Sequence, residues 1–333
     1  MYIENGLHNS CEDNILVFDS WETYRNTIEN LDTAIENEAN TFDATIPVGT
    51  TDDQYDLLAE TSGFDEDNPL LRFEEDLHFC SLRQMLLNQE DEWLEQQEDG
   101  VWDVNEDPDN HFIDDDTERA LLTERALLNE GIEVIIGSKK QGLVIYKFTD
   151  NGGYIAIYNM DVVALQEINQ GNIPRNNNNI VVFTPPKPAA DPNCKTKIAE
   201  TKYIPYGGNR IKIKSKVVNT DSWSHKKIFS STKGYIKKRG RWRLRRTLLT
   251  AGITDMNGLT NGLVYNQCST EFNVFKSKES RRKKVKVKIK GDYFQNVTYN
   301  SLKIGIHNNK LYSYHKQGVI NINDDFYDMP NSI

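Results

Sequence analysis

The sequence predicts an α+β protein with an acidic helical N-terminal region, a small β module and a C-terminal antiparallel β-sandwich. Two observations carry this prediction. Residues 1–150 contain 38 acidic and 8 basic side chains, whereas residues 151–333 contain 12 acidic and 31 basic ones. Apolar residues recur at helical spacing in the first 130 residues, while short β-rich runs dominate the rest. The overall net charge of −11 therefore describes neither half of the chain.

Residues 1–130 are the predicted acidic, mostly helical region. The apolar run NILVF at residues 14–18 precedes Asp19 and Glu22, whose spacing is typical of a capping box. We therefore expect an extended entry followed by a helix over residues 20–37. Helical patterns of the same kind recur at residues 55–60, 70–94 and 116–129.

Residues 131–168 are the predicted small β-hairpin module. Three β-rich runs, at 132–136, 143–148 and 154–159, are separated by turns that contain glycine. Residues 169–193 are rich in asparagine and proline, and apart from the apolar run at 180–183 they are typical of a linker.

Residues 194–325 are the predicted basic β-sandwich domain, followed by a tail at 326–333. Strand-like runs recur at intervals of roughly ten residues or more. Val285, Val287 and Ile289 alternate with lysines, which places one face of the strand on a core and the other in water. About seven to nine such strands without an intervening helix are typical of an antiparallel sandwich.

The compartment is open to two interpretations. The first residues lack the basic and apolar regions of a signal peptide, so the protein is either cytoplasmic or begins after a removed signal. No run approaches the roughly 18 apolar residues of a membrane span. The four cysteines lack zinc-site spacing. Cys194 and Cys268 would form a disulfide in an oxidising compartment, and separate thiols are the alternative.

One acidic segment has the outline of a calcium loop. Oxygen ligands at positions 1, 3, 5, 7 and 12 of such a loop would come from Asp103, Asn105, Asp107, Asp109 and Asp114. Pro108 stands where the loop requires glycine, and aspartate replaces the usual bidentate glutamate. A solvated acidic loop is therefore the competing interpretation, and no other cofactor is expected.

Two basic segments are candidates for binding an anionic partner. Basic side chains interleaved with an aromatic one suit phosphate contacts combined with base stacking. The same pattern also fits a hairpin with a solvated face, and attraction between the two oppositely charged halves is a third interpretation. The candidate residues are Lys237, Lys238, Arg239, Arg241, Trp242, Arg243, Arg245, Arg246, Arg281, Arg282, Lys283 and Lys284.

No enzyme signature accompanies these segments. The six histidines are dispersed, and the sequence contains no serine-hydrolase, phosphate-loop or dinucleotide-binding motif. A third class of function rests on aromatic residues of the basic half, which would either line a carbohydrate platform or fill the sandwich core. These residues are Tyr203, Tyr206, Trp223, Tyr235 and Trp242.

Three segments together resemble a family of uncharacterised secreted proteins, often lipoproteins, from Bacteroidetes bacteria. They are residues 14–31 (NILVFDSWETYRNTIENL), residues 126–165 with their leucine-rich start and isoleucine–glycine hairpin, and the basic, tryptophan-bearing residues 230–247. The resemblance implies an extracellular or envelope location and a binding or structural role. It carries over no active site.

Taken together, these features predict a non-enzymatic secreted or cell-surface protein whose acidic and basic halves form complementary interfaces. Its expected partner is another protein or a second copy of itself. The alternatives are a nucleic-acid-binding or injected effector protein that uses the basic half, and a carbohydrate-binding module, with nucleic acid or an anionic glycan as the ligand.

Overall fold

A computed structural model of the chain shows an α+β protein with two compact units, each of which is described by itself. Unit 1 comprises residues 1–46, 64–95 and 112–185, and unit 2 comprises residues 47–63, 96–111 and 186–333. The structure describes residues 2–4, 14–89, 122–138, 140–149, 153–184, 194–195, 197–206, 209–221, 225–238, 241–244, 246–253, 263–266, 270–273, 276–293, 303–305, 312–317 and 326–328.

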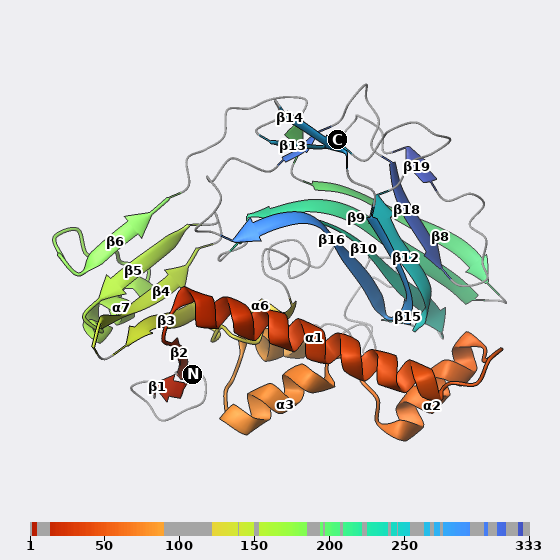
Figure 1. Ribbon diagram of the computed structural model, residues 1–333, viewed down its shortest axis with the longest axis horizontal. Helices are drawn as coiled ribbons and strands as arrows, with labels where there is room; N and C mark the ends of the chain where they lie inside the picture. The colour runs from red at the N-terminus through yellow and green to blue at the C-terminus, as the bar shows by residue number, and fades with distance from the viewer. Residues whose placement is uncertain are drawn as a thin grey trace. The chain divides into compact units, whose positions relative to one another are not determined.

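Unit 1 is built on a six-stranded sheet in the order β1-β2-β3-β4-β5-β6 (Figure 1). The β2 and β3 strands are parallel, and every other neighbouring pair is antiparallel. The strands are β1 (Tyr2–Glu4), β2 (Ile15–Phe18), β3 (Glu133–Ser138), β4 (Gly142–Phe148), β5 (Tyr154–Tyr158) and β6 (Ile180–Phe183). The three β runs predicted within residues 132–159 thus share a sheet with the apolar run at 14–18.

One face of this sheet packs against helix α7 (Val162–Asn169). Ile15 and Val17 alternate with Leu16 and Phe18 along β2, so the two pairs point to opposite faces. The face toward α7 forms a buried cluster. Its members are Ile15, Val17, Ile135, Ile145, Ile155, Ile157, Ala164, Leu165 and Ile168. Because all four residues of β2 are buried, this strand is covered on both faces.

The other face carries aromatic side chains that meet the start of helix α1 (Trp21–Thr45). Trp21 packs edge-on against Tyr146 with ring centroids 4.9 Å apart, and Tyr24 packs edge-on against Phe18 at 5.1 Å. The α1 helix begins at the N-cap Ser20, whose side chain accepts a hydrogen bond from Thr23 N–H at 3.1 Å. The expected helix over 20–37 is confirmed and extends further.

Three shorter helical segments, at residues 68–77, 82–89 and 122–125, also belong to the described part of unit 1. Helix α3 (Asn68–Leu77) contacts α1 and ends at His78, whose backbone is left-handed with φ of 48°. The chain then becomes helical again at 82–89, so the pattern at 70–94 belongs to two helices rather than one. Of the helix expected at 116–129, the structure describes α6 (Leu122–Arg125).

A buried ion pair joins α3 to the helix at residues 82–89. Arg83 and Glu74 have side chains that are 1% and 0% exposed. Arg83 donates from Nε to Glu74 Oε1 at 2.9 Å and from Nη2 to Oε2 at 2.5 Å. Ser81 and Gln84 also donate to Glu74. The carboxylate is therefore fully paired, which is the condition for burying a charge without a large penalty.

The β3–β4 hairpin requires glycine at one position. Gly137 has φ of 128°, and a Cβ atom there would lie 2.2 Å from the carbonyl oxygen of Gly142. No side chain fits such a gap, because contacts under about 3 Å between a Cβ and a carbonyl oxygen are repulsive. This glycine explains the turn that the sequence pattern predicted.

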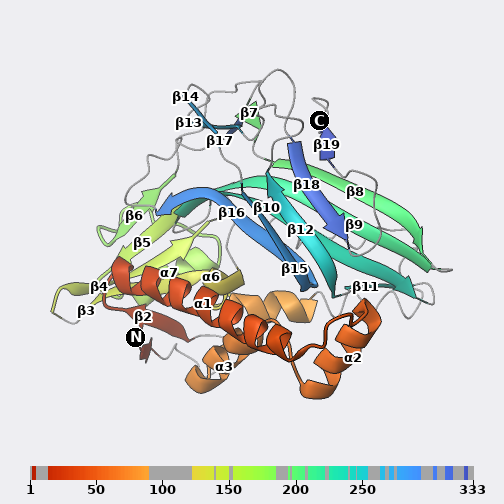
Figure 2. The same cartoon turned by 45° about the vertical axis from the view of Figure 1, so that its right-hand side comes forward.

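Within the described residues, unit 2 contains three antiparallel sheets and one helix at residues 52–62. The largest described sheet has the order β11-β10-β9-β8 and is joined by β16 along β10 (Figure 2). Its strands are β8 (Lys197–Tyr206), β9 (Asn209–Asp221), β10 (His225–Lys238), β11 (Arg241–Leu244) and β16 (Lys284–Tyr293). The second sheet contains β12 (Thr247–Ile253), β15 (Lys276–Arg282), β18 (Tyr312–Gln317) and β19 (Phe326–Asp328). The third contains β7 (Cys194–Lys195), β13 (Leu263–Asn266), β14 (Thr270–Asn273) and β17 (Lys303–Gly305).

Candidate functional site

Helix α2 (Asp52–Ser62) links the acidic half of the chain to the basic strands of unit 2. Thr51 caps it through a complete capping box: Thr51 Oγ1 accepts from Gln54 N–H, and Gln54 Oε1 accepts from Thr51 N–H. The helix ends at Gly63 in the left-handed conformation, with φ of 69°. These signals fix both ends of a short helix that intrinsic propensity alone would leave marginal.

The N-terminal half of α2 contacts two arginines at the end of β15 and a third that directly precedes β12. Thr247, at the start of β12, is paired with Arg282, at the end of β15. Arg246 directly precedes β12, and Arg281 is paired with Leu248. The hairpin-like register of β12 and β15 therefore gathers side chains that are far apart in sequence.

The contacts are polar, short and largely buried. Arg281 Nε lies 2.9 Å from Asp52 Oδ1, and Thr247 Oγ1 donates to Asp52 Oδ2 at 2.5 Å. Arg246 Nη1 lies 3.4 Å from Asp56 Oδ1. Opposite charges at these distances attract, and burial reduces the screening of that attraction by salt.

Tyr55 stands between these ion pairs. Its hydroxyl accepts a hydrogen bond from Arg282 Nη1 at 3.0 Å, and the guanidinium carbon of Arg281 lies 5.2 Å from the centre of its ring. Tyr55 is 2% exposed, and Arg246 and Arg282 are 6% and 8% exposed. We name Asp52, Tyr55, Asp56, Arg246, Thr247, Arg281 and Arg282 the α2 contact.

The α2 contact contains three of the twelve residues predicted to bind an anionic partner, Arg246, Arg281 and Arg282. The other nine lie elsewhere. Lys237 and Lys238 end β10, and Arg241, Trp242 and Arg243 belong to β11, with Lys238 paired to Arg241 as the hairpin interpretation expects. Lys283 is partly exposed and Lys284 begins β16. Arg239 and Arg245 lie outside the described residues.

Other predicted site residues fall where the structure describes no side chain. Asp103, Asn105, Asp107, Asp109 and Asp114 lie outside the described residues, as does Cys268, while Cys194 begins β7. The side chains of the five aromatic residues named for the basic half are likewise not described. Among the helices within the described ranges, none has the length and apolar character needed to cross a membrane.

Cys80 is disulfide-bonded. The pairing predicted from the sequence, between Cys194 and Cys268, stays a prediction because Cys268 lies outside the described residues. Cys80 stands at the break between α3 and the helix at 82–89, where no spacing signal marks it.

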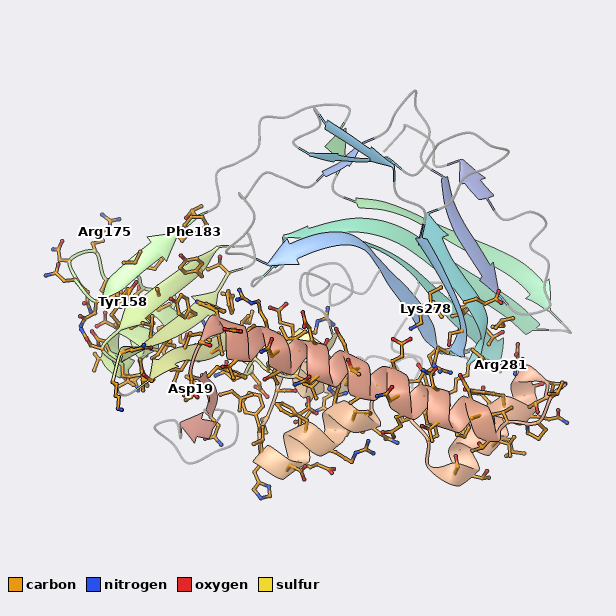
Figure 3. All side chains as sticks on the ribbon, viewed as in Figure 1. Asp19, Tyr158, Arg175, Phe183, Lys278 and Arg281 are labelled. Carbon is orange, nitrogen blue, oxygen red and sulfur yellow. The ribbon has the colours of Figure 1, made fainter. Side chains whose placement is uncertain are left out.

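A row of aromatic side chains in unit 1 is a surface that the sequence analysis missed. Tyr154 packs edge-on against Tyr146 with centroids 5.5 Å apart and stacks on Phe183 at 5.1 Å and 17°. Tyr158, on the same face of β5, is 41% exposed (Figure 3). Burial, followed by the nearby hydroxyl of Tyr158, raises the pKa values of both Tyr146 and Tyr154. Alternation along β4 and β5 is the signal that could have found this row.

Comparisons with known proteins do not assign the chain to a family. No known family and no curated protein matches the chain. Its structure is similar to the crystal structure of a DUF4848 family protein from Bacteroides thetaiotaomicron, with a TM-score of 0.23 and 10% identity over 95% of this chain and 97% of that one. That neighbour comes from an uncharacterised Bacteroidetes family, in line with the predicted resemblance, and at this TM-score it carries no argument about fold or function.

Proposed function

We propose that the protein is a non-enzymatic secreted or cell-surface binding or structural protein whose acidic and basic halves form complementary interfaces. The observation that carries this proposal is the α2 contact. Two aspartates from the acidic half pair with two arginines from the basic half, and Tyr55 contacts Arg281 and Arg282. Part of the charge asymmetry is thus satisfied within the chain.

An extracellular or envelope location is part of the same proposal. The disulfide of Cys80 supports it, because disulfides persist in oxidising compartments and are rare in the cytosol of most organisms. We also propose that the basic strands form a sandwich. This is supported by β12, whose sheet is separate from the five-stranded sheet and which contacts β10 and β16 of that five-stranded sheet.

Retention on immobilised heparin and on DNA, as a function of salt, tests the proposal against an external anionic partner. We expect the full chain to elute at low salt, because Arg246, Arg281 and Arg282 are directed to α2. Asp52→Asn should increase retention, because it removes the carboxylate that pairs with Arg281 and leaves that guanidinium available to the polyanion. Glu60→Gln, which removes the same charge from an exposed position on the same helix, is the matched control and should have a smaller effect.

Strong retention of the unaltered protein at physiological salt, equal in both variants, would contradict the proposal. It would indicate that the basic residues outside the α2 contact bind a polyanion directly. The location is tested separately by mapping the disulfide of Cys80 in protein isolated from its native cells. A reduced Cys80 there would contradict the extracytoplasmic assignment.

A further inference from the structure

The outer edge of the sheet in unit 1 is apolar and uncharged. Strand β6 is the last strand in the sheet order, and both views show it at that edge (Figures 1 and 2). Val181 and Val182 are each 48% exposed, although alternation places them on opposite faces. Edge strands are normally protected by charged residues, twisting or cover. The opposite edge strand β1 ends in Glu4, whereas residues 176–186 contain no charged side chain.

The hydrogen-bond pattern shows which groups of β6 face outward. Tyr158 N–H donates to the carbonyl of Asn179 at 2.8 Å, so these two residues form a hydrogen-bonded antiparallel pair. Bonded and non-bonded pairs alternate, and the peptide groups of Ile180 and Val182 therefore point away from β5. Ile180 N–H donates to Asn177 at 3.2 Å. Within the described residues, Val182 keeps both its N–H and its carbonyl at the edge.

We propose that β6 pairs antiparallel with β6 of a second copy of this chain, about a two-fold axis at Val182. In this register the two Val182 residues exchange two hydrogen bonds. Thr184 N–H of each copy also meets the Ile180 carbonyl of the other. A register centred on Val181 would instead require Ile180 N–H, which already donates to Asn177. The edge thus specifies one self-complementary alignment.

Packing favours a second copy as the occupant. The like net charges of −11 oppose association, and the absence of charged side chains at residues 176–186 removes local repulsion at this edge. On the face away from α7, Val181 would lie opposite Phe183 of the second copy. Because Phe183 already stacks on Tyr154, the pairing would continue the aromatic row across the axis. On the other face the two Val182 side chains would cover each other.

Sedimentation of the full chain at increasing concentration tests the proposal directly. We expect a monomer–dimer equilibrium that Val182→Lys shifts strongly to monomer, because it places two like charges across the axis. Val163→Lys is the matched control, since Val163 is 62% exposed on α7 in the same unit, and it should leave the equilibrium unchanged. A wild-type chain that stays monomeric, or a dimer that Val182→Lys does not weaken, would overturn the proposal.

Cysteine crosslinking tests the register. In a hydrogen-bonded pair the Cα atoms are about 5.5 Å apart, within the range of about 4.4–6.8 Å that a disulfide spans. Mild oxidation of Val182→Cys should therefore give a covalent dimer above the wild-type background. In Val181→Cys the two cysteines would be offset diagonally at about 7–8 Å, and crosslinking should be much weaker. Equal crosslinking at both positions would contradict an axis at Val182.

Discussion

Replacing Arg83 by methionine should destabilise unit 1 far more than an ordinary surface substitution. The variant leaves Glu74, 1% exposed, without the guanidinium that donates two hydrogen bonds to it. It also removes the bond from Arg83 Nη1 to Asp67 at 3.3 Å. Removing one partner of a buried ion pair typically costs about 3–5 kcal/mol, because the remaining charge stays buried and uncompensated.

The structure supplies a matched control for this prediction. Arg72 pairs with Glu38, but its side chain is 57% exposed, so Arg72→Met should cost about 0–1 kcal/mol. The double variant Arg83→Met/Glu74→Leu should recover much of the lost stability, because it removes the buried charge altogether. Ser81 and Gln84 would still lose their acceptor, at about 1 kcal/mol each.

Urea unfolding followed by circular dichroism measures these differences as shifts of the midpoint. Equal free energies of unfolding for Arg83→Met and Arg72→Met would refute the reasoning. So would a double variant that is less stable than Arg83→Met alone, since burial of an unpaired carboxylate could not then be the cause.

Three further predictions follow from local contacts. Tyr24 donates to Glu124 at 3.2 Å, so Tyr24→Phe should cost about 1–3 kcal/mol in urea unfolding. Burial raises the pKa of Tyr24 above 10.0, so wild-type stability should fall as the pH rises above about 10, and the variant should show less of this loss. The hydrogen bond from Asn177 lowers the pKa of Asp161. The carboxylate therefore stabilises this segment at neutral pH, and that stabilisation is lost as acid protonates Asp161. Asp161→Ala should increase hydrogen exchange of residues 170–179 at neutral pH and much less in acid. Gly137→Ala should lower the thermal midpoint by several degrees, because its Cβ has no room, and an unchanged midpoint would contradict the hairpin geometry.

Local sequence patterns predict which segments form helices and strands better than they predict the residues at which these begin and end. The apolar run at 14–18 and the three β runs at 131–159 are strands, because alternation and β-branched residues act over a few positions. The sequence predicts a cap at Asp19, whereas Ser20 is the N-cap of α1. The break at His78 was missed, since a left-handed histidine leaves no mark on helical periodicity.

Long-range arrangement could not be predicted from the sequence. Nothing local indicates that β2 is parallel to β3, or that α2 belongs to a different unit from α1 and α3. Attraction between the two halves stays a prediction of the charge split, and the sequence indicates only some of the residues of the α2 contact. Arg246, Arg281 and Arg282 stood among the candidates, while Asp52 and Asp56 were lost among many carboxylates. Their position opposite the arginines depends on the register of β12 and β15.

The most direct test of the account is a double-mutant cycle between Asp52 and Arg281 in the full chain. The free energy of unfolding of unit 2 would be measured for wild type, Asp52→Asn, Arg281→Met and the double variant, at low and high salt. Because the two side chains are 12% and 26% exposed and 2.9 Å apart, we predict a coupling of about 1–2 kcal/mol that weakens as salt is added. Effects that simply add, within about 0.3–0.5 kcal/mol, would contradict the claim that the acidic and basic halves hold each other together at α2.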